Sequence, residues 1–151
     1  ALLRKALPVA DFLPYVVAQI LGAVVASLAV LTITGESFAP SPSAGTSTIS
    51  AFLVELLFTF ALAYVVLNVA VAKKVAGNSY FGLAIGFTIV VAAYAGGGIS
   101  GGAFNPAVGL GPTIIHATMG SGNWSSVWLY IVAPLGGAAL AAGVASVQQD
   151  G

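Results

Sequence analysis

The sequence has no cysteine and very little charge, and each absence excludes a class of protein. Its 151 residues include four Lys or Arg and four Asp or Glu, so that only 5 % are charged. A soluble domain carries about 25 % charged residues, and this chain could not cover a water-facing surface. Without cysteine there is no disulfide framework and no thiolate metal site, and we expect no metal and no cofactor. The zero net charge and the lack of a basic run argue against nucleic-acid binding.

Hydrophobic residues make up 59 % of the chain and gather in long runs. A helix needs about 20 apolar residues to cross a hydrocarbon core of roughly 30 Å. Several runs meet this need, which predicts an all-α, multi-pass membrane protein in contact with the lipid bilayer. The four predicted spans are 12–32, 50–72, 80–95 (short for a span) and 127–147.

The basic residues predict the orientation of the spans. Arg4 and Lys5 precede the first span, and Lys73 and Lys74 follow the second, so alternating spans place both pairs on one side. The positive-inside rule makes that side cytoplasmic. We therefore expect the N- and C-termini in the cytoplasm and the protein in an inner or plasma membrane.

A glycine-rich stretch, GGISGGAFNPAVGLG at 97–111, interrupts the apolar sequence after the third span. We expect the glycine run 96–102 to descend into the membrane as extended chain. Asn105 is a good N-cap and Pro106 suits the first position of a helix, which predicts a short helix over 105–117. At about 20 Å this helix cannot span, so the pattern indicates a re-entrant half-helix that ends at mid-membrane.

This geometry predicts a chemistry. A helix N-terminus aimed at the membrane centre presents unpaired N–H groups and roughly half a positive charge. The Asn105 amide adds donors, and extended glycines offer carbonyl acceptors. Such a site would guide small neutral hydrogen-bonding molecules while the helix dipole repels cations.

Asn105-Pro106-Ala107, in the setting ISGGAFNPAVGLGP, resembles the second signature loop of the aquaporin and glycerol-facilitator (major intrinsic protein) family. The stretches PYVVAQILGAVVAS, VELLFTFALAYVVLNV, YFGLAIGFTIVVAAYAGGG and WLYIVAPLGGAALAA are similar to the family's third, fourth, fifth and sixth spans. The resemblance thus covers nearly the whole chain from about Pro14.

The resemblance implies a right-handed helix bundle with two half-helices that meet tip to tip at mid-membrane. This chain matches only the last four of six family spans and the second half-helix. Residues 1–151 are therefore expected to form one membrane domain that lacks the first two spans and the first half-helix, and to be unable to close a family pore alone. The implied function is passive transport of water and small neutral solutes by a homotetramer.

The resemblance also implies roles for single residues. Asn105 would donate to solutes, Pro106 would start the half-helix, and the small Ala107 would permit tip-to-tip contact. Val108 stands where family water channels place an Arg, Ala93 stands where many place a His, and Gly102 takes the filter's loop position. All three are small or apolar, which implies a wide, uncharged filter. The substrate pathway would comprise Ala93, Gly101, Gly102, Ala103, Asn105, Pro106, Ala107 and Val108.

Two polar residues inside the spans are expected to brace the re-entrant segment. A carboxylate at membrane depth costs about 2.5–3.5 kcal/mol on insertion scales, so Glu55 needs a partner. The matching family Glu accepts hydrogen bonds from the re-entrant backbone. Gln19 is expected to support a half-helix in a similar way.

Two other functions stay open. The chain could be a non-conducting partial or scaffold membrane protein. More remotely, residues 98–102 fit the G-x-S-x-G pattern, and GISG resembles the serine motif of rhomboid intramembrane proteases. The only candidate base for Ser100 is His116, which the expected half-helix places about 16 Å further out. We therefore expect no enzyme.

Overall fold

The computed structural model describes residues 1–121 and 124–150, and every regular element within them is helical. The last residues of the predicted re-entrant stretch, 122–123, and Gly151 of the predicted domain lie outside the described residues. The helices are α1 (Val9–Thr34), α2 (Thr48–Val66), α3 (Phe81–Ser100), α4 (Pro106–His116) and α5 (Val127–Asp150). Short turns accompany them: η1 (Leu2–Arg4) and η3 (Lys73–Val75) are 3₁₀ turns, and η2 (Leu67–Val71) and η4 (Ala117–Ser121) are π-type turns.

Four helices are long and apolar enough to cross a membrane, which confirms the all-α membrane fold. They are Val9–Thr34, Thr48–Val71, Phe81–Ser100 and Val127–Gln148. The predicted first span overlaps α1, the second overlaps α2 and η2, and the fourth overlaps α5. The bounds of each predicted span differ from those of the helix by only a few residues. With 11 residues, α4 is about 16 Å long and too short to span.

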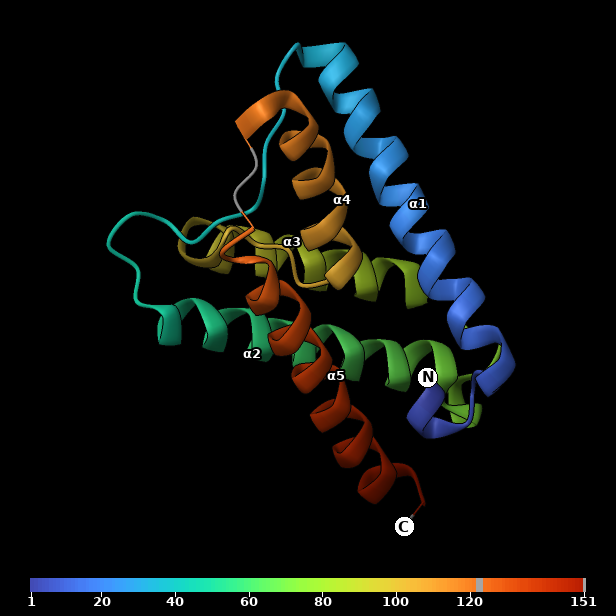
Figure 1. The fold of residues 1–151 in the computed structure, drawn as a ribbon. Coiled ribbons are helices and arrows are strands. Elements are labelled where there is room, and N and C mark those ends of the chain that lie inside the picture. The colour runs from blue at the N-terminus through green and yellow to red at the C-terminus, as the bar shows by residue number, and fades with distance from the viewer. Residues whose placement is uncertain (122–123, 151) are drawn as a thin grey trace.

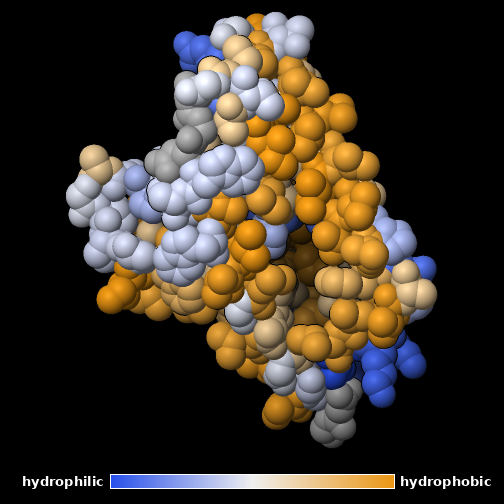
Figure 2. Space-filling model, viewed as in Figure 1, coloured by the Kyte–Doolittle hydropathy of each residue, from blue (hydrophilic) through white to orange (hydrophobic). Residues whose placement is uncertain are grey.

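The axes of α2 and α3 lie in similar directions, and α1, α4 and α5 run across them (Figure 1). α2 and α3 pack together, and α5 crosses α2 in the most extensive helix contact of the bundle. α1 packs mainly on α4. Apolar side chains cover much of the outer surface, as Figure 2 shows, and this is the surface that lipid would contact.

The third span is longer than the sequence predicted, because the glycine run 96–100 continues α3 instead of descending as extended chain. Glycine is unfavourable in a helix interior by about 1 kcal/mol, but tertiary packing outweighs this cost here. A Cβ at Gly96 would lie 2.7 Å from the Val54 side chain, so glycine lets α3 approach α2 closely. In lipid, a helix also satisfies backbone groups that extended chain would leave unpaired. The non-helical link between α3 and α4 is therefore limited to 101–104.

Glycine also determines how closely α5 approaches α2. A methyl group at Gly137 would collide with the carbonyl oxygen of Leu56 and lie 2.9 Å from the Phe60 amide nitrogen. Both atoms belong to the α2 backbone and cannot rotate away. Nearer the C-terminus of α5, Ala141, Ala142 and Ala145 pack against Leu67.

The substitution Gly137→Ala should therefore destabilise the bundle by about 1–3 kcal/mol, because α2 and α5 must separate. We expect the unfolding temperature in detergent, followed by circular dichroism, to fall by about 2–4 °C per kcal/mol. Gly143→Ala is the matched control on the same helix, since a Cβ there meets nothing within 4 Å. That change should leave stability equal or higher. Equal effects of the two substitutions would contradict the packing argument.

Candidate functional site

The site is built at the junction where the chain leaves α3 and turns back into α4. Gly101 and Gly102 have φ angles of 93° and 66°, and Phe104 has a φ of 50°. This left-handed backbone is accessible to glycine and costly for other residues. At Gly101 space is also lacking, because a Cβ would lie 2.8 Å from the Ser41 carbonyl oxygen and 2.9 Å from the Tyr130 hydroxyl oxygen.

The buried carboxylate of Glu55, on α2, holds this junction. Its Oε1 accepts hydrogen bonds from the Ser100 hydroxyl at 2.7 Å and the Ala103 amide at 3.0 Å. Its Oε2 accepts one from the Phe104 amide at 2.6 Å. Hydrogen bonds to an ionised acceptor are roughly twice as strong as neutral ones. The carboxylate thus supplies acceptors to backbone amides that no helix satisfies.

Two further residues extend the hydrogen-bond network around Glu55. The Ser100 hydroxyl, besides donating to Glu55, accepts from the Gly102 amide at 3.1 Å. The Tyr130 hydroxyl, from α5, donates to the Ser100 carbonyl oxygen. Glu55, Ser100 and Tyr130 are all fully buried, so α2, α3 and α5 meet at the junction.

Two neighbouring side chains of α2 hold Phe104 in its unfavourable left-handed backbone conformation. The Thr59 hydroxyl donates to the Phe104 carbonyl oxygen at 3.2 Å. The ring of Phe104 packs edge-on against Phe58, with centroids 5.7 Å apart. Left-handed backbone at a non-glycine residue costs of order 1–3 kcal/mol and persists only where the surroundings enforce it. Thr59 and Phe58, together with the Glu55 carboxylate, provide that enforcement.

Three carbonyls at the junction accept no hydrogen bond from the part of the chain that the structure describes: those of Gly101, Gly102 and Ala103. The carbonyls on either side are all paired. The pairs are Gly101 N to Gly97 O, Ser43 Oγ to Gly98 O, Ser43 N to Ile99 O, Tyr130 OH to Ser100 O and Thr59 Oγ1 to Phe104 O. The unpaired acceptors of the junction are therefore confined to three consecutive residues.

Asn105 begins the half-helix as the sequence predicted. Its side-chain oxygen accepts from the Ala107 amide at 2.9 Å, and its carbonyl accepts from the Gly109 amide at 3.0 Å. Pro106 takes the first helical position, where its missing N–H leaves no donor unpaired. Because the Asn105 oxygen faces a donor, its NH₂ group faces away from the helix and keeps both hydrogens for other acceptors.

Two glycines allow α4 to pack closely against the helices on both sides of it. A Cβ at Gly111 would lie 2.5 Å from the Ala23 side chain of α1, and one at Gly109 would lie 2.5 Å from the Tyr130 side chain of α5. α4 is therefore fixed from both sides, with its N-terminus at the centre of the bundle and its C-terminus near the end of α1 (Figure 1).

The tip of α4 opens on a cavity of about 700 Å³ between α1 and α5. Its walls are mostly apolar, and Gln19, Asn105, Pro106 and Ala107 all lie on them. Figure 2 shows a hollow on this face of the molecule. The Asn-Pro-Ala tip of α4 and Gln19 of α1 thus line the same cavity.

The other residues predicted for the pathway lie outside the cavity lining. Ala93 is exposed on α3, and Val108 is 44 % exposed on α4. Gly101 is exposed, Gly102 half-buried and Ala103 buried. Their assignment to a pathway therefore stays a prediction.

The sequence model of the family described as "Major intrinsic protein" matches residues 1–144. The chain belongs to the major intrinsic protein family. It is similar to Aquaporin TIP1-2 of Zea mays, with 41 % identity over 133 residues that cover 86 % of this chain and 50 % of that protein. It is also similar to Nodulin-26 of Glycine max, with 35 % identity over 88 % of this chain and 48 % of that protein. Glycerol uptake facilitator protein-like 6 of Lactiplantibacillus plantarum is 38 % identical over 97 % of this chain and 68 % of its own length.

The resemblance on which the sequence analysis relied is thus confirmed. This major intrinsic protein spans about half the length of the first curated relatives that it matches. Members of the family are channels and not enzymes, which also decides against the protease alternative.

The local contacts agree with that decision. The Ser100 hydroxyl donates its single hydrogen to the Glu55 carboxylate at 2.7 Å, with the Gly96 carbonyl further away at 3.4 Å, inside a fully buried environment. His116 Nδ1 is hydrogen-bonded to the Ser37 hydroxyl at 2.9 Å, at the other end of α4. The two residues of the proposed serine–histidine pair are therefore engaged with different partners.

Sequence reasoning missed Thr59, Phe104, Ser100 and Tyr130 as parts of the junction. Only Thr59 carried a usable signal: it lies four residues after Glu55, and residues four apart share one helix face. The other contacts depend on helices that are distant in the sequence.

Replacing Glu55 by Gln should destabilise this major intrinsic protein by about 2–3 kcal/mol, because one of the two backbone amides loses its acceptor and meets an NH₂ group. We expect a lower unfolding temperature and faster hydrogen exchange of the Ala103 and Phe104 amides. Ser100→Ala should have a smaller effect of the same kind. Glu36→Gln is the control, because Glu36 lies exposed in the loop after α1. Unchanged exchange in the Glu55 variant would show that the carboxylate does not hold the junction.

Proposed function

We propose that this chain supplies one wall and one half-helix of a passive membrane channel for water and small neutral solutes. The observation that carries the proposal is the Asn105 side chain on the cavity wall at the N-terminus of α4, shortly after three residues, 101–103, whose carbonyls accept no hydrogen bond from the described part of the chain. A small molecule that both donates and accepts hydrogen bonds can exchange its water partners for these groups in turn. The family supports the same function.

The charges around the cavity favour neutral solutes. Its lining holds no side chain that is charged at neutral pH. The N-terminus of α4, which carries roughly half a positive charge, lies at the tip. An approaching cation would lose hydration and meet a positive helix end, whereas a neutral molecule pays neither electrostatic cost.

The proposed filter is wide and uncharged. Val108, Ala93 and Gly102, at the positions that the resemblance assigns to the filter, bear only small or apolar side chains. An Arg at position 108 would add a positive charge and a fork of five donors. Its absence supports passage of solutes such as glycerol and urea besides water. The names of the relatives mention aquaporins and a glycerol uptake facilitator, which fits this range.

The conducting unit is proposed to need more than residues 1–151. The first curated relatives are about twice as long as their match to this chain. Two further spans and a first half-helix would face the tip of α4 across the cavity and complete the pore. Gln19, which lines the cavity, would brace one half-helix there. Assembly as a homotetramer in an inner or plasma membrane belongs to the same proposal.

The alternative is a non-conducting scaffold. One observation favours it: α1 packs mainly on α4, with a single buried residue, Ser27, and the cavity beside it is open to the surface. A pore wall with an open side would not separate solutes from lipid. Flux measurements distinguish the two functions.

We predict that proteoliposomes containing this chain, joined behind the first half of the Zea mays relative, conduct water, glycerol and urea by stopped-flow light scattering. Permeability equal to that of empty vesicles would favour the scaffold. Water conduction without glycerol or urea conduction would overturn the wide filter while leaving the channel intact.

Val108→Arg in the same protein should lower glycerol and urea flux about tenfold, which corresponds to about 1.4 kcal/mol of barrier, with a smaller effect on water. Val108→Ala is the matched control and should conduct all three. If the Arg variant passes glycerol as well as the wild type does, Val108 does not lie at the filter.

The orientation can be tested directly, because the chain has no cysteine. In sealed vesicles of known sidedness, a membrane-impermeant maleimide should label Lys73→Cys from the cytoplasmic side only. Glu36→Cys should be labelled from the opposite side only. Labelling of both variants from one side would contradict the predicted arrangement of spans.

A further inference from the structure

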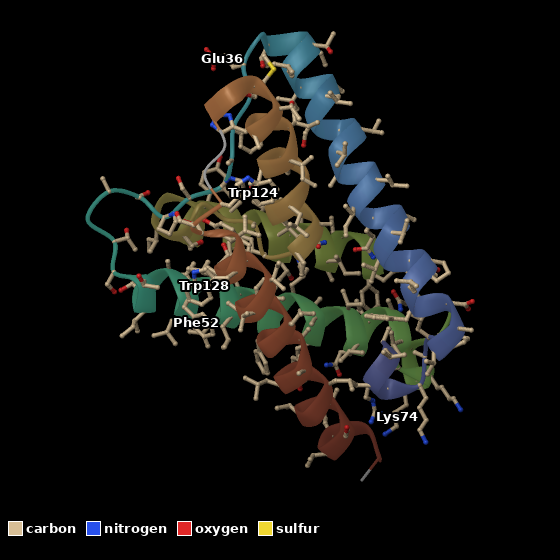
Figure 3. The ribbon with its side chains drawn as sticks, viewed as in Figure 1. Glu36, Phe52, Lys74, Trp124 and Trp128 are labelled. Carbon is tan, nitrogen blue, oxygen red and sulfur yellow. The ribbon has the colours of Figure 1, made fainter. Side chains whose placement is uncertain are left out.

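All four Lys and Arg of the chain lie in two short turns, one before α1 and one after α2. Arg4 ends η1 and Lys5 follows it, while Lys73 and Lys74 begin η3. Because α1 and α2 are consecutive spans, the start of α1 and the end of α2 face the same side of the membrane. Figure 3 shows Lys74 at the opposite end of the molecule from Glu36.

Both turns are held by hydrogen bonds and are not loose chain. In the first, the Lys5 amide donates to the Leu2 carbonyl at 3.0 Å, and the Ala6 amide donates to the Ala1 carbonyl at 3.0 Å. In the second, the Ala76 amide donates to the Lys73 carbonyl at 3.2 Å.

Asn78 ties the second turn back to the helix that precedes it. Its side-chain NH₂ donates to the carbonyl oxygens of Val69 and Val75, each at 2.7 Å. The lysine backbone at positions 73 and 74 is therefore fixed relative to the end of the second span.

The first turn contacts α5, and the second follows an element that does. η1 contacts α5, and η2, which leads directly into η3, also contacts α5. Leu67 at the start of η2 packs against Ala141, Ala142 and Ala145 of α5. Both turns are thus connected to the last span, the first directly and the second through η2.

The lysines are available to a partner from outside the chain. Lys5, Lys73 and Lys74 are exposed, and none of them forms an ion pair with an acid in the described part of the chain. One acid, Asp11, lies in the first turn of α1. The three exposed lysines give a positive surface at the start of α1 and the end of α2.

We propose that the two turns form one binding site for the phosphate headgroup of an anionic phospholipid in the leaflet that they face. Cations directly beyond the ends of spans lie at headgroup depth, and long Lys side chains reach the interface while their stems stay on apolar surface. Each such cation near an anionic membrane favours association about fivefold. A headgroup held between the turns would link the start of α1 to the end of α2. This link matters because α1 packs mainly on α4.

The test uses the full chain reconstituted in phosphatidylcholine bilayers with a trace of spin-labelled phosphatidylglycerol or spin-labelled phosphatidylcholine. Electron paramagnetic resonance measures the association of each lipid with the protein. We expect a preference for phosphatidylglycerol of at least about fivefold. Lys73→Gln with Lys74→Gln should reduce this preference towards unity, and Lys5→Gln should reduce it in part. The double variant Lys73→Arg with Lys74→Arg keeps the charge and should keep the preference.

Several outcomes would overturn the proposal. A wild-type preference below about twofold, or one that survives neutralisation of the lysines, excludes the site. Independent, additive losses from Lys5→Gln and from the Lys73/Lys74 change would show two separate patches rather than one site.

Competition by inorganic phosphate that exceeds the effect of sodium chloride at equal ionic strength would show a site for free anions. Solute flux is not part of the readout, so the result does not depend on the channel proposal.

Discussion

The buried carboxylate of Glu55 is the contact on which the rest of the site depends. The chain must leave one helix and enter another inside an apolar bundle, and the amides of the junction have no helix to satisfy them. In lipid each unpaired amide would cost several kcal/mol. Two carboxylate oxygens accept from two backbone amides and from the Ser100 hydroxyl. The cost of placing a charge at membrane depth is thereby offset by hydrogen bonds that hold the half-helix inward.

Close approach between helices is the second condition, and small residues provide it. Gly109 and Gly111 let α4 lie between α5 and α1, and Gly137 lets α5 cross α2 at backbone contact. In a membrane, where lipid is as apolar as the helix surfaces, such packing and hydrogen bonding replace the hydrophobic drive that operates in water. The glycines thus place α2 and α5 where Glu55 and Tyr130 can reach the junction.

Much of this fold could be predicted from the sequence, since lipid restricts a spanning chain to few structures. Apolar runs predicted the spans, Asn105-Pro106 predicted the start of α4, and the isolation of Glu55 in a span predicted that it needs partners. The end of α3 was predicted wrongly, because glycine content suggested extended chain while the contact of Gly96 with α2 decides the outcome. Phe104 and Tyr130 act through contacts between segments that are distant in the sequence, and no local pattern predicts those contacts. Thr59 alone had a local signal, because it lies four residues after Glu55 on the same helix.

The junction is also what favours a channel over a carrier among membrane transport functions. A carrier needs an element with two arrangements of similar energy around its site. Residues 100–104 are instead held by Glu55 and Thr59 from α2, by Tyr130 from α5, and by Ser43 from the loop between α1 and α2 at the preceding turn. Each of these partners would have to be released together for the segment to move. In the proposed channel, a junction fixed in this way would present the same carbonyls and the same Asn105 amide to every solute. Transport past it would then follow only the gradient of the solute.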